Sequence, residues 1–368
     1  MWYGRTMNEI REELQQALIR LQYNRFTDVQ KQTLPHTLVG EDVRVQAPAG
    51  SGKTLAYVLP VLSSLPLQGT KKHLPQALIL SPTRELSLQI ADVIRNMLFH
   101  IEGYRTAVLT GGTDIKVQIR NNAKGADIIV GTPSRILDHI HRHTLKLKEC
   151  HILVLDEADE MLSMGFESDV REIISFLKEH QTMMFSATWN KQVTALSNDI
   201  LNNPYTVKIE ETVLPLQVKY HLVSINDTHK LEETARIIRK ARTQALVFTN
   251  RKATADFVSE YLNKGGITAA AIHSDMNYAI RKKTMNDFRN RKLQVLCATS
   301  VASRGIDIPS MRCVILYDIP DTKEELIHRT ARTGRNGTEG NAWLLCNRQE
   351  LEKYDYTDIL DNIVKDRR

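Results

Sequence analysis

The stretch DVRVQAPAGSGKTLAYVLP, residues 42–60, joins a short apolar run to a glycine-rich loop and then to a helical segment. Within it, APAGSGKT matches the pattern G-x-x-x-x-G-K-[ST], except that alanine stands at the first position. Gly50 and Gly52 permit a tight loop whose backbone N–H groups can surround phosphate oxygens, and the dipole of the following helix favours an anion there. Lys53 would supply a positive charge for the β- and γ-phosphates and Thr54 a hydroxyl for Mg²⁺. The stretch therefore predicts a nucleotide-binding loop.

Short apolar runs alternate with amphipathic stretches on both sides of this loop. Strands that are apolar on both faces are typical of a parallel, doubly wound α/β sheet, in which helices cover each face. Ligands of such sheets bind beyond the C-terminal ends of the strands, so functional residues should follow the apolar runs directly. The strands predicted in the first half are residues 42–47, 76–81, 106–110, 127–131, 151–156 and 182–187.

The alternation pauses around KIEETVLPLQVKYHLV and then resumes. Because 368 residues also exceed the usual size of one domain, we predict two α/β domains in tandem. The first covers residues 1–209, the linker 210–217 and the second 218–368. The strands predicted in the second domain are residues 244–250, 267–273, 293–299, 312–318 and 341–347.

Composition limits the class of protein. No apolar run approaches the roughly 18 residues needed to cross a bilayer, and the N-terminal segment is not of signal-peptide type, so no membrane partner is expected. The four cysteines lie far apart, which argues against a disulfide framework or zinc site and favours a reducing compartment. We expect a cytoplasmic location, with the nucleus or an organelle left open. The net charge of +6 agrees with a polyanionic partner, although many proteins are modestly basic.

The segment HILVLDEADE provides the acidic site that a phosphate-binding loop requires. An apolar strand ends there in Asp156 and Glu157. Asp156 would hold Mg²⁺ through its water shell, and Glu157 would orient or deprotonate a water that attacks the phosphate. Taken alone, the acidic run could equally be a helix start favoured by the helix dipole. Its position after a buried strand, together with the glycine-rich loop, favours the metal site.

VLDEADEMLSMGFE, read with APAGSGKT, SAT (186–188) and HRTARTGR (328–335), closely resembles the DEAD-box RNA helicases. Further matches occur in family order from about Leu21 to Arg335, and Asp159 in place of His points away from the related DEAH group. The resemblance implies two RecA-like domains, ATP and Mg²⁺ as cofactors, RNA as partner and a monomeric core. The further matches are PTREL (82–86), GG (111–112), TPSR (132–135), Phe248 to Arg251, Arg281 and TSVASRGID (299–307).

The resemblance assigns nucleotide contacts residue by residue. Gln30 matches the glutamine that reads the adenine edge, and a side-chain amide offers both a donor and an acceptor, as adenine does. Trp2 and Tyr3 are the alternatives for an upstream aromatic that stacks on adenine. Catalytic roles are implied for Lys53, Asp156, Glu157, Arg332 and Arg335. The full nucleotide-binding set is Tyr23, Gln30, Ala49, Gly50, Ser51, Gly52, Lys53, Thr54, Asp307, Arg332 and Arg335.

The resemblance also implies a path for the RNA backbone across both domains. Hydroxyls, arginines and backbone N–H groups contact phosphates there without reading sequence, although each such residue taken singly is an ordinary turn or helix residue. Ser186, Thr188, Asp159 and His328 are implied to couple the nucleotide state to RNA binding. The implied RNA contacts are Pro82, Thr83, Arg84, Gly112, Thr132, Arg135, Arg251, Arg281 and Thr299.

Three positions depart from the usual family pattern. Tyr278 stands where glutamine is usual, three residues before Arg281, which weakens the prediction of that RNA contact. Ser300 replaces a frequent aspartate, as it does in one branch of the family, and Ala331 replaces a usual glycine. We expect none of the three to inactivate the ATPase.

The basic segment IHRTARTGRNG (327–337) has two possible targets, RNA or the nucleotide. Arg332 and Arg335 are three residues apart and would share a face of one helical turn. With a phosphate-binding loop in the other domain, we expect both to reach the γ-phosphate of ATP when the two domains close. His328 would link this segment to the coupling residues.

Three functions therefore remain. The leading one is an ATP-dependent RNA helicase that unwinds short duplexes by closure of its domains. An ATP-gated RNA clamp with little turnover is the first alternative, and the presence of Lys53, Glu157, Arg332 and Arg335 argues against it. A DNA translocase of a neighbouring branch is the second, and it is disfavoured by Gln30 and Asp159.

Overall fold

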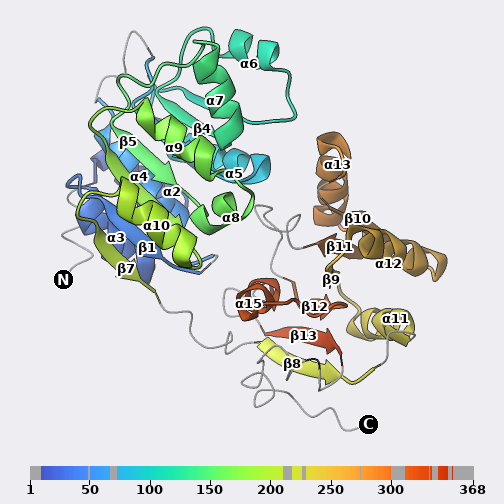
Figure 1. Cartoon of the computed structure of the whole chain (residues 1–368). Coiled ribbons are helices and arrows are strands. Elements are labelled where there is room, and N and C mark those ends of the chain that lie inside the picture. Colours follow the sequence, from blue (N-terminus) through green and yellow to red (C-terminus); the bar gives the residue numbers. More distant parts are fainter. Residues whose placement is uncertain are drawn as a thin grey trace. The chain divides into compact units, whose positions relative to one another are not determined.

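The computed structural model describes residues 10–48, 50–66, 73–209, 218–225, 229–273, 275–299, 311–330, 332–333, 339–346 and 350. The chain divides into two compact units, Met1–Glu211 and Thr212–Arg368 (Figure 1). Each unit is described by itself. The predicted linker, residues 210–217, lies outside the described residues, so its bounds stay a prediction.

The first unit is built on a seven-stranded parallel sheet with the order β3-β4-β2-β5-β6-β1-β7. β1 lies between β6 and β7, with Val45 beside both Phe185 and Val207. The strands are β1 (Val43–Gln46), β2 (Ala77–Leu80), β3 (Thr106–Leu109), β4 (Ile128–Gly131), β5 (Ile152–Leu155), β6 (Gln181–Ser186) and β7 (Tyr205–Lys208).

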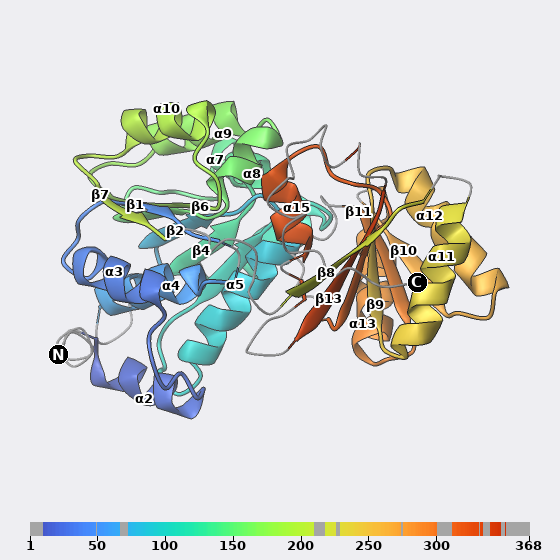
Figure 2. The same cartoon turned by 90° about the horizontal axis from the view of Figure 1, so that it is seen from below.

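Helices cover both faces of this sheet, and Figure 2 shows α3, α4 and α5 on one side and α7, α9 and α10 on the other. Thr83 caps α5, Asp114 caps α6 and Asn190 caps α10, each by accepting a backbone N–H of the first turn. The helices are α2 (Glu12–Arg20), α3 (Asp28–Thr37), α4 (Lys53–Ser64), α5 (Arg84–Met97), α6 (Ile115–Asn121), α7 (Pro133–His141), α8 (Ala158–Ser163), α9 (Glu167–Ser175) and α10 (Lys191–Ile200).

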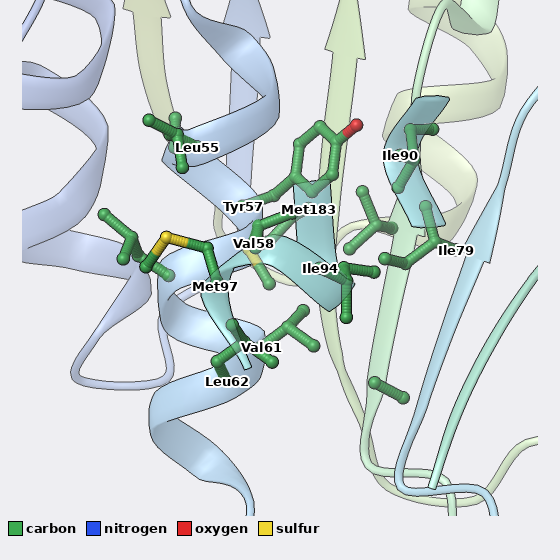
Figure 3. Close-up of a cluster of buried hydrophobic side chains, with 14 of the residues drawn as sticks. Leu55, Tyr57, Val58, Val61, Leu62, Ile79, Ile90, Ile94, Met97 and Met183 are labelled. Atoms are coloured by element: carbon green, nitrogen blue, oxygen red, sulfur yellow. The ribbon is translucent and has the colours of Figure 1, made fainter. Parts of the chain in front are cut away.

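The helix that follows the glycine-rich loop, α4, is deeply buried along most of its length. Every residue from Leu55 to Leu62 is buried, against α5 on one side and the sheet on the other. Figure 3 shows Val58 and Val61 of α4 packed near Ile94 and Met97 of α5. Each such aliphatic side chain stabilises the fold by roughly 1.5–3 kcal/mol on burial. The loop at the start of α4 is therefore attached to a rigid core.

The second unit has a six-stranded parallel sheet with the order β10-β11-β9-β12-β13-β8. Buried residues of α11 and α12 pack on one face, and those of α13 and α15 on the other. The elements are β8 (Val218–Val223), α11 (Lys230–Ala241), β9 (Ala245–Thr249), α12 (Lys252–Lys264), β10 (Ala269–Ile272), α13 (Tyr278–Arg289), β11 (Val295–Thr299), β12 (Cys313–Leu316), α15 (Lys323–Thr330) and β13 (Gly340–Leu345).

The predicted fold class is confirmed, since both units are parallel α/β sheets with helices on each face. Every predicted strand is present, but β7 and β8 were not predicted. Both lie at a sheet edge, where one side of the strand has no neighbour. In β7 only Val207 is buried, and β8 has buried Val218 and Tyr220 on alternate positions. Such strands lack the continuous apolar run by which the others were recognised. None of the helices in the described ranges is long and apolar enough to cross a membrane.

Candidate functional site

The glycine-rich loop follows β1 and leads into α4. Gly50 and Gly52 have φ angles of +79° and +97°, a conformation that favours glycine. Gly52 also has no room for a side chain, because a Cβ there would lie 2.6 Å from Gln30 Nε2 and 2.8 Å from Thr27 Oγ1. Ala49 lies outside the described residues. Backbone geometry and close approach therefore both require glycine at the position that caps α4.

Gln30 connects α3 to this loop. Its Nε2 donates to the Gly52 carbonyl at 2.9 Å, and its Oε1 accepts the backbone N–H of Thr27 at 3.0 Å. A primary amide has two N–H donors and two acceptor lone pairs, so one of each remains for a base. Tyr23, the other predicted adenine contact, is 41% exposed. The structure thus places the predicted adenine-reading glutamine directly against the phosphate loop.

Lys53 is the first residue of α4 and is buried. Its Nζ donates to the Ala47 carbonyl at 2.7 Å, so the ammonium folds back over the loop. The charge of Lys53 acts to lower the pKa of the carboxyl groups of both Asp156 and Glu157. Lys53 and the two acidic residues therefore share one electrostatic site.

Asp156 follows β5 directly and is buried. Its Oδ2 accepts the hydroxyl of Tyr57 at 2.7 Å, and its Oδ1 accepts the backbone N–H of Glu157 at 3.0 Å. Burial raises the pKa of Asp156, with the charge of Lys53 acting in the opposite sense. Burial, followed by the charge of Asp156, holds the pKa of Tyr57 well above its usual value, so its hydroxyl is a hydrogen donor.

Glu157 caps α8 with a left-handed backbone, at a φ of +52°. Burial, then the negative charge of Asp156, raises the pKa of Glu157 to about 7. Its Oε2 is buried and accepts no hydrogen bond from any described residue. A buried carboxylate oxygen without a donor is costly, so this atom fits a site completed by water or a ligand.

The donor set fits a hydrated Mg²⁺ better than a directly bound ion. Among the residues that the structure describes, no group of three His, Cys, Asp or Glu could hold a metal by itself. Thr54 is half-buried and offers a hydroxyl, and Asp156 offers carboxylate oxygens. Mg²⁺ usually keeps several waters and takes one or two carboxylates together with phosphate oxygens. These residues fit that pattern.

The predicted coupling residues of the first unit are hydrogen-bonded to one another. Asp159 Oδ2 accepts both the backbone N–H and the hydroxyl of Thr188, at 2.9 and 2.8 Å. Ser186 Oγ accepts the N–H of Asp159 at 3.2 Å and donates to the Thr188 carbonyl at 2.6 Å. Although burial acts to raise it, the bonds from Thr188 lower the pKa of Asp159. The end of β6 is thereby tied to the start of α8.

Predicted RNA contacts of the first unit gather at the C-terminal ends of β2, β3 and β4. Arg84 Nη1 donates to the Gly111 carbonyl at 3.0 Å, and Arg135 Nη1 donates to the Thr113 carbonyl at 2.7 Å. Gly112, between these two acceptors, has a φ of +76°, and a Cβ there would lie 2.7 Å from Arg84 Nη1. The two arginines therefore lie on either side of one exposed loop.

The remaining predicted contacts of this unit differ in exposure. Thr132 is half-buried and directly precedes α7, and its hydroxyl does not cap the helix. Thr83 is also half-buried, but its hydroxyl accepts the N–H of Leu86 at 3.2 Å. Pro82 is buried. Thr132 thus has a hydroxyl that a ligand could reach, whereas Pro82 shapes the turn after β2.

Gln118 of α6 is a supporting residue that the sequence did not reveal. It is buried, its Oε1 accepts Arg135 Nη1 at 3.0 Å and His139 Nε2 at 3.1 Å, and its Nε2 donates to the Thr110 carbonyl at 2.8 Å. Arg135 is therefore held in place by α6 as well as by the loop after β3. A glutamine in a short helix carries no sequence signal for this role.

Replacing Arg84 by Ala should weaken binding of single-stranded RNA and reduce its salt dependence. One lost phosphate contact lowers the slope of log affinity against log salt by roughly 0.7 for a single strand. Arg95→Ala is the matched control, since Arg95 lies on the same helix and pairs with Asp92 at the surface. RNA titrations at several salt concentrations measure both quantities. Equal behaviour of the two variants would contradict an RNA contact at Arg84.

In the second unit, Thr299 lies beside Thr249 at the C-terminal ends of β11 and β9. Arg251 is exposed and lies between β9 and α12, and Arg281 lies in α13 and is half-buried. Two of the three predicted RNA contacts of this unit therefore belong to neighbouring strand ends. Asp307, Arg335, Ser300 and Ala331 lie outside the described residues, as do the side chains of Tyr278 and His328.

The basic segment contains one cation with a structural role. Arg329 is 3% exposed, and its guanidinium donates to the Asp318 carbonyl, to Asn250 Oδ1 and to Glu325 Oε1 at 2.7–3.0 Å. It also lies over the ring of Phe248 at 5.5 Å. These contacts tie α15 to the ends of β9 and β12.

Arg332 does not lie in a helix, and Arg335 lies outside the described residues, so the face that the two were predicted to share stays untested. α15 ends at Thr330, and Thr333 forms a bridge with Met311. Arg332 lies in the turn between them, and its carbonyl accepts the N–H of Met311 at 2.9 Å. Because α15 ends at Thr330 and Thr333 pairs with Met311, Arg332 is not part of the helix on which the predicted spacing depends.

Replacing Arg329 by Ala should destabilise the second unit strongly. Each hydrogen bond to a charged group contributes roughly 1.5–3 kcal/mol, and the buried guanidinium makes three of them, although Glu325 is only half-buried and Asn250 is exposed. Arg239→Ala is the control, since Arg239 is exposed on α11 and donates only to the Gly265 carbonyl among the hydrogen bonds described. Chemical denaturation of both variants measures the difference. A native midpoint in Arg329→Ala would contradict the structural role.

Sequence comparisons agree with this arrangement. The model of the DEAD/DEAH box helicase family matches residues 27–196, and that of the helicase conserved C-terminal domain matches residues 229–337. The ATP-dependent RNA helicase CshA of Listeria monocytogenes is 36% identical over 97% of this chain and 68% of its own length. CshA of Geobacillus kaustophilus is 36% identical over 92% of this chain and 73% of its own length.

The chain belongs to the DEAD-box family of ATP-dependent RNA helicases. The fraction of a relative's length that the chain spans differs between relatives. It spans 55% of the DeaD protein of Buchnera aphidicola, to which it is 38% identical. Among solved structures, this DEAD-box chain is similar to Saccharomyces cerevisiae Dbp5 bound to RNA and ADP BeF3, with a TM-score of 0.83 and 26% identity over 96% of this chain and 91% of that one. A Methanococcus jannaschii DEAD box protein gives a TM-score of 0.54 and 33% identity over 96% of both chains. The predicted family is therefore confirmed.

Proposed function

We propose that this DEAD-box protein hydrolyses ATP to ADP and phosphate when RNA binds, and that it separates short RNA duplexes locally. The observation that supports this most is the grouping in the first unit. Lys53 and the pair Asp156–Glu157 interact electrostatically at one site, while Arg84 and Arg135 lie at neighbouring strand ends. One sheet edge thus offers both a site for a nucleotide and a backbone path for RNA.

The residues of the proposed nucleotide site would contact different parts of the nucleotide. Gln30 and Tyr23 would bind adenine, while Gly50, Ser51 and the other loop residues would surround the phosphates with backbone N–H groups. Thr54 and Asp156 would hold a hydrated Mg²⁺, which when bound neutralises charge on the phosphates. Lys53 would move from the Ala47 carbonyl to the β- and γ-phosphates.

Glu157 is proposed to orient the attacking water and to accept its proton. Its Oε2 is buried without a hydrogen-bond donor among the described residues, so it can accept one from water. A general base must lie within hydrogen-bond reach of the proton that it takes. The left-handed backbone at Glu157 directs the side chain away from the regular path of α8.

RNA would bind by its backbone, without sequence preference. Arg84, Gly112, Thr132 and Arg135 of the first unit would contact phosphates and ribose, with Pro82 and Thr83 shaping the turn. The second unit would contribute Arg251, Arg281 and Thr299. The modest positive charge of the whole chain agrees with this partner.

Hydrolysis would be coupled to RNA by closure of the two units. ATP and RNA together would favour a closed state in which Asp307 reaches the ribose and Arg332 and Arg335 reach the γ-phosphate. Asp159, Ser186 and Thr188 would communicate this state through His328. Bending of the bound strand would strip a short stretch of its partner, and phosphate release would reopen the protein. We propose that a monomer suffices.

The test compares ATP hydrolysis without nucleic acid, with single-stranded RNA and with single-stranded DNA of the same sequence. RNA should raise turnover and DNA should not, and short RNA duplexes should separate in the presence of ATP. Nucleotide-dependent RNA retention with negligible turnover would favour the RNA clamp. Equal stimulation by DNA would favour the translocase. Either result would overturn the proposal.

A further inference from the structure

The hydroxyl of Tyr57 contacts Asp156 of the candidate nucleotide site, although Tyr57 lies outside the motifs APAGSGKT and DEAD. Tyr57 is fully buried, and its ring packs edge-on against Phe185 of β6, with ring centroids 5.2 Å apart. Figure 3 shows the ring within the apolar cluster of α4 and α5. A phenylalanine would satisfy this packing, so the hydroxyl has to be explained by what it contacts.

The hydroxyl links two parts of the site that are distant in sequence. It donates to Asp156 Oδ2 at 2.7 Å across 99 residues. On α4, Tyr57 comes three residues after Thr54 and four after Lys53, so the three residues share a face. The phenol of this helix therefore contacts Asp156, one of the two residues that would hold Mg²⁺.

The two hydrogen bonds to Asp156 together fix the plane of its carboxylate. Oδ2 accepts from Tyr57, and Oδ1 accepts from the backbone N–H of Glu157. Each oxygen keeps a lone pair for a further donor, such as a water of a hydrated cation. Without the phenol, the neighbouring N–H group alone, among the hydrogen bonds of the described residues, would restrain rotation of the side chain.

We propose that Tyr57 is a positioning residue that orients Asp156 toward the water shell of Mg²⁺ and links that carboxylate to the helix of the phosphate loop. The inference rests on the proposed nucleotide site but goes beyond its direct contacts. Groups that orient metal-binding side chains contribute to metal affinity even though they never touch the ion. The phenol therefore acts through Asp156 alone.

The experiment measures ADP binding over a range of Mg²⁺ concentrations for the full chain, by calorimetry. Tyr57→Phe keeps the ring and removes the hydroxyl. We expect the half-saturating Mg²⁺ concentration to rise roughly 10- to 100-fold, while ADP affinity without metal stays close to native and the unfolding midpoint falls, because a buried carboxylate oxygen loses its donor. Because this readout is binding at equilibrium, it requires neither RNA nor turnover.

Tyr104→Phe is the matched control in the same unit. The Tyr104 hydroxyl donates to the Pro66 carbonyl and accepts from Arg11, away from the phosphate loop. This variant should keep the native Mg²⁺ dependence. In an Asp156→Ala background, Tyr57→Phe should have no further effect, since the residue through which it acts is gone.

The outcomes separate the two proposals. An unchanged Mg²⁺ dependence in Tyr57→Phe, or an equal shift in the Asp156→Ala background, would overturn the positioning role and leave the nucleotide site intact. A lower unfolding midpoint with native Mg²⁺ dependence would show that the hydroxyl is only structural, and would also overturn it. If the native chain bound no ADP at any Mg²⁺ concentration, the proposed function and this inference would fail together.

Discussion

Glu157→Gln should lose ATP hydrolysis almost completely while still binding ATP and RNA. Glutamine has nearly the same shape as glutamate but cannot accept a proton, and loss of a general base typically slows a reaction by roughly 10²–10⁴-fold. The buried Oε2 has no protein donor among the described residues, so the substitution breaks no hydrogen bond to that atom. Single-turnover hydrolysis with saturating RNA measures the loss of the chemical step.

Glu167→Gln provides the matched control. Glu167 is a partly exposed residue of α9 that pairs with Arg171, in the same unit but outside the predicted site. The Glu167→Gln variant should hydrolyse ATP at the native rate. RNA retention by Glu157→Gln in the presence of ATP should outlast that of the native chain, since the closed state is not released by hydrolysis. Native turnover in Glu157→Gln would refute its role as the base.

Arg335→Ala should reduce turnover by a larger factor than it reduces ATP affinity. An arginine that stabilises the transition state for phosphate transfer contributes roughly 10³–10⁵ to the rate. The proposed ATP contacts are mostly in the first unit, where Gln30 and Lys53 lie at the phosphate loop. Steady-state turnover and ATP affinity, measured on the same preparation, give the two factors.

The Arg335→Lys variant separates the effect of charge from that of geometry, and Arg236→Ala is the matched control. Lysine keeps the charge but loses the planar fork of the guanidinium, so only a small part of the rate should return. Arg236 is exposed on α11 and pairs with Glu233, so its removal should leave turnover unchanged. If Arg335→Ala and Arg236→Ala turn over equally fast, Arg335 does not contact the reacting phosphate.

The parts of the site that could be predicted from the sequence are those with local signals. The phosphate loop needs glycines at fixed positions before a lysine, and the acidic pair follows a buried strand, so each is readable within about a dozen residues. The buried strands were readable because continuous apolar runs mark strands that are covered on both faces. The structure then brings Lys53, Asp156 and Glu157 into one electrostatic site.

The features that could not be predicted from the sequence depend on contacts between residues that are distant in the chain. Tyr57 and Asp156 are 99 residues apart, and nothing in the spacing of either motif joins them. Gln118 supports Arg135 from a short helix with no pattern of its own. The end of α15 is set by the pairing of Thr333 with Met311, so a helical spacing could not predict the direction of Arg332.

At Glu157 the left-handed backbone lowers the stability of the fold, while the side chain is proposed to serve catalysis. A residue other than glycine costs about 1–2 kcal/mol in this conformation, and the buried, unpartnered carboxylate oxygen adds to that cost. Glycine there would relieve both terms and remove the base. Selection for stability alone would therefore favour replacement of Glu157. Variants that gain thermal stability by a substitution at Glu157 should be inactive.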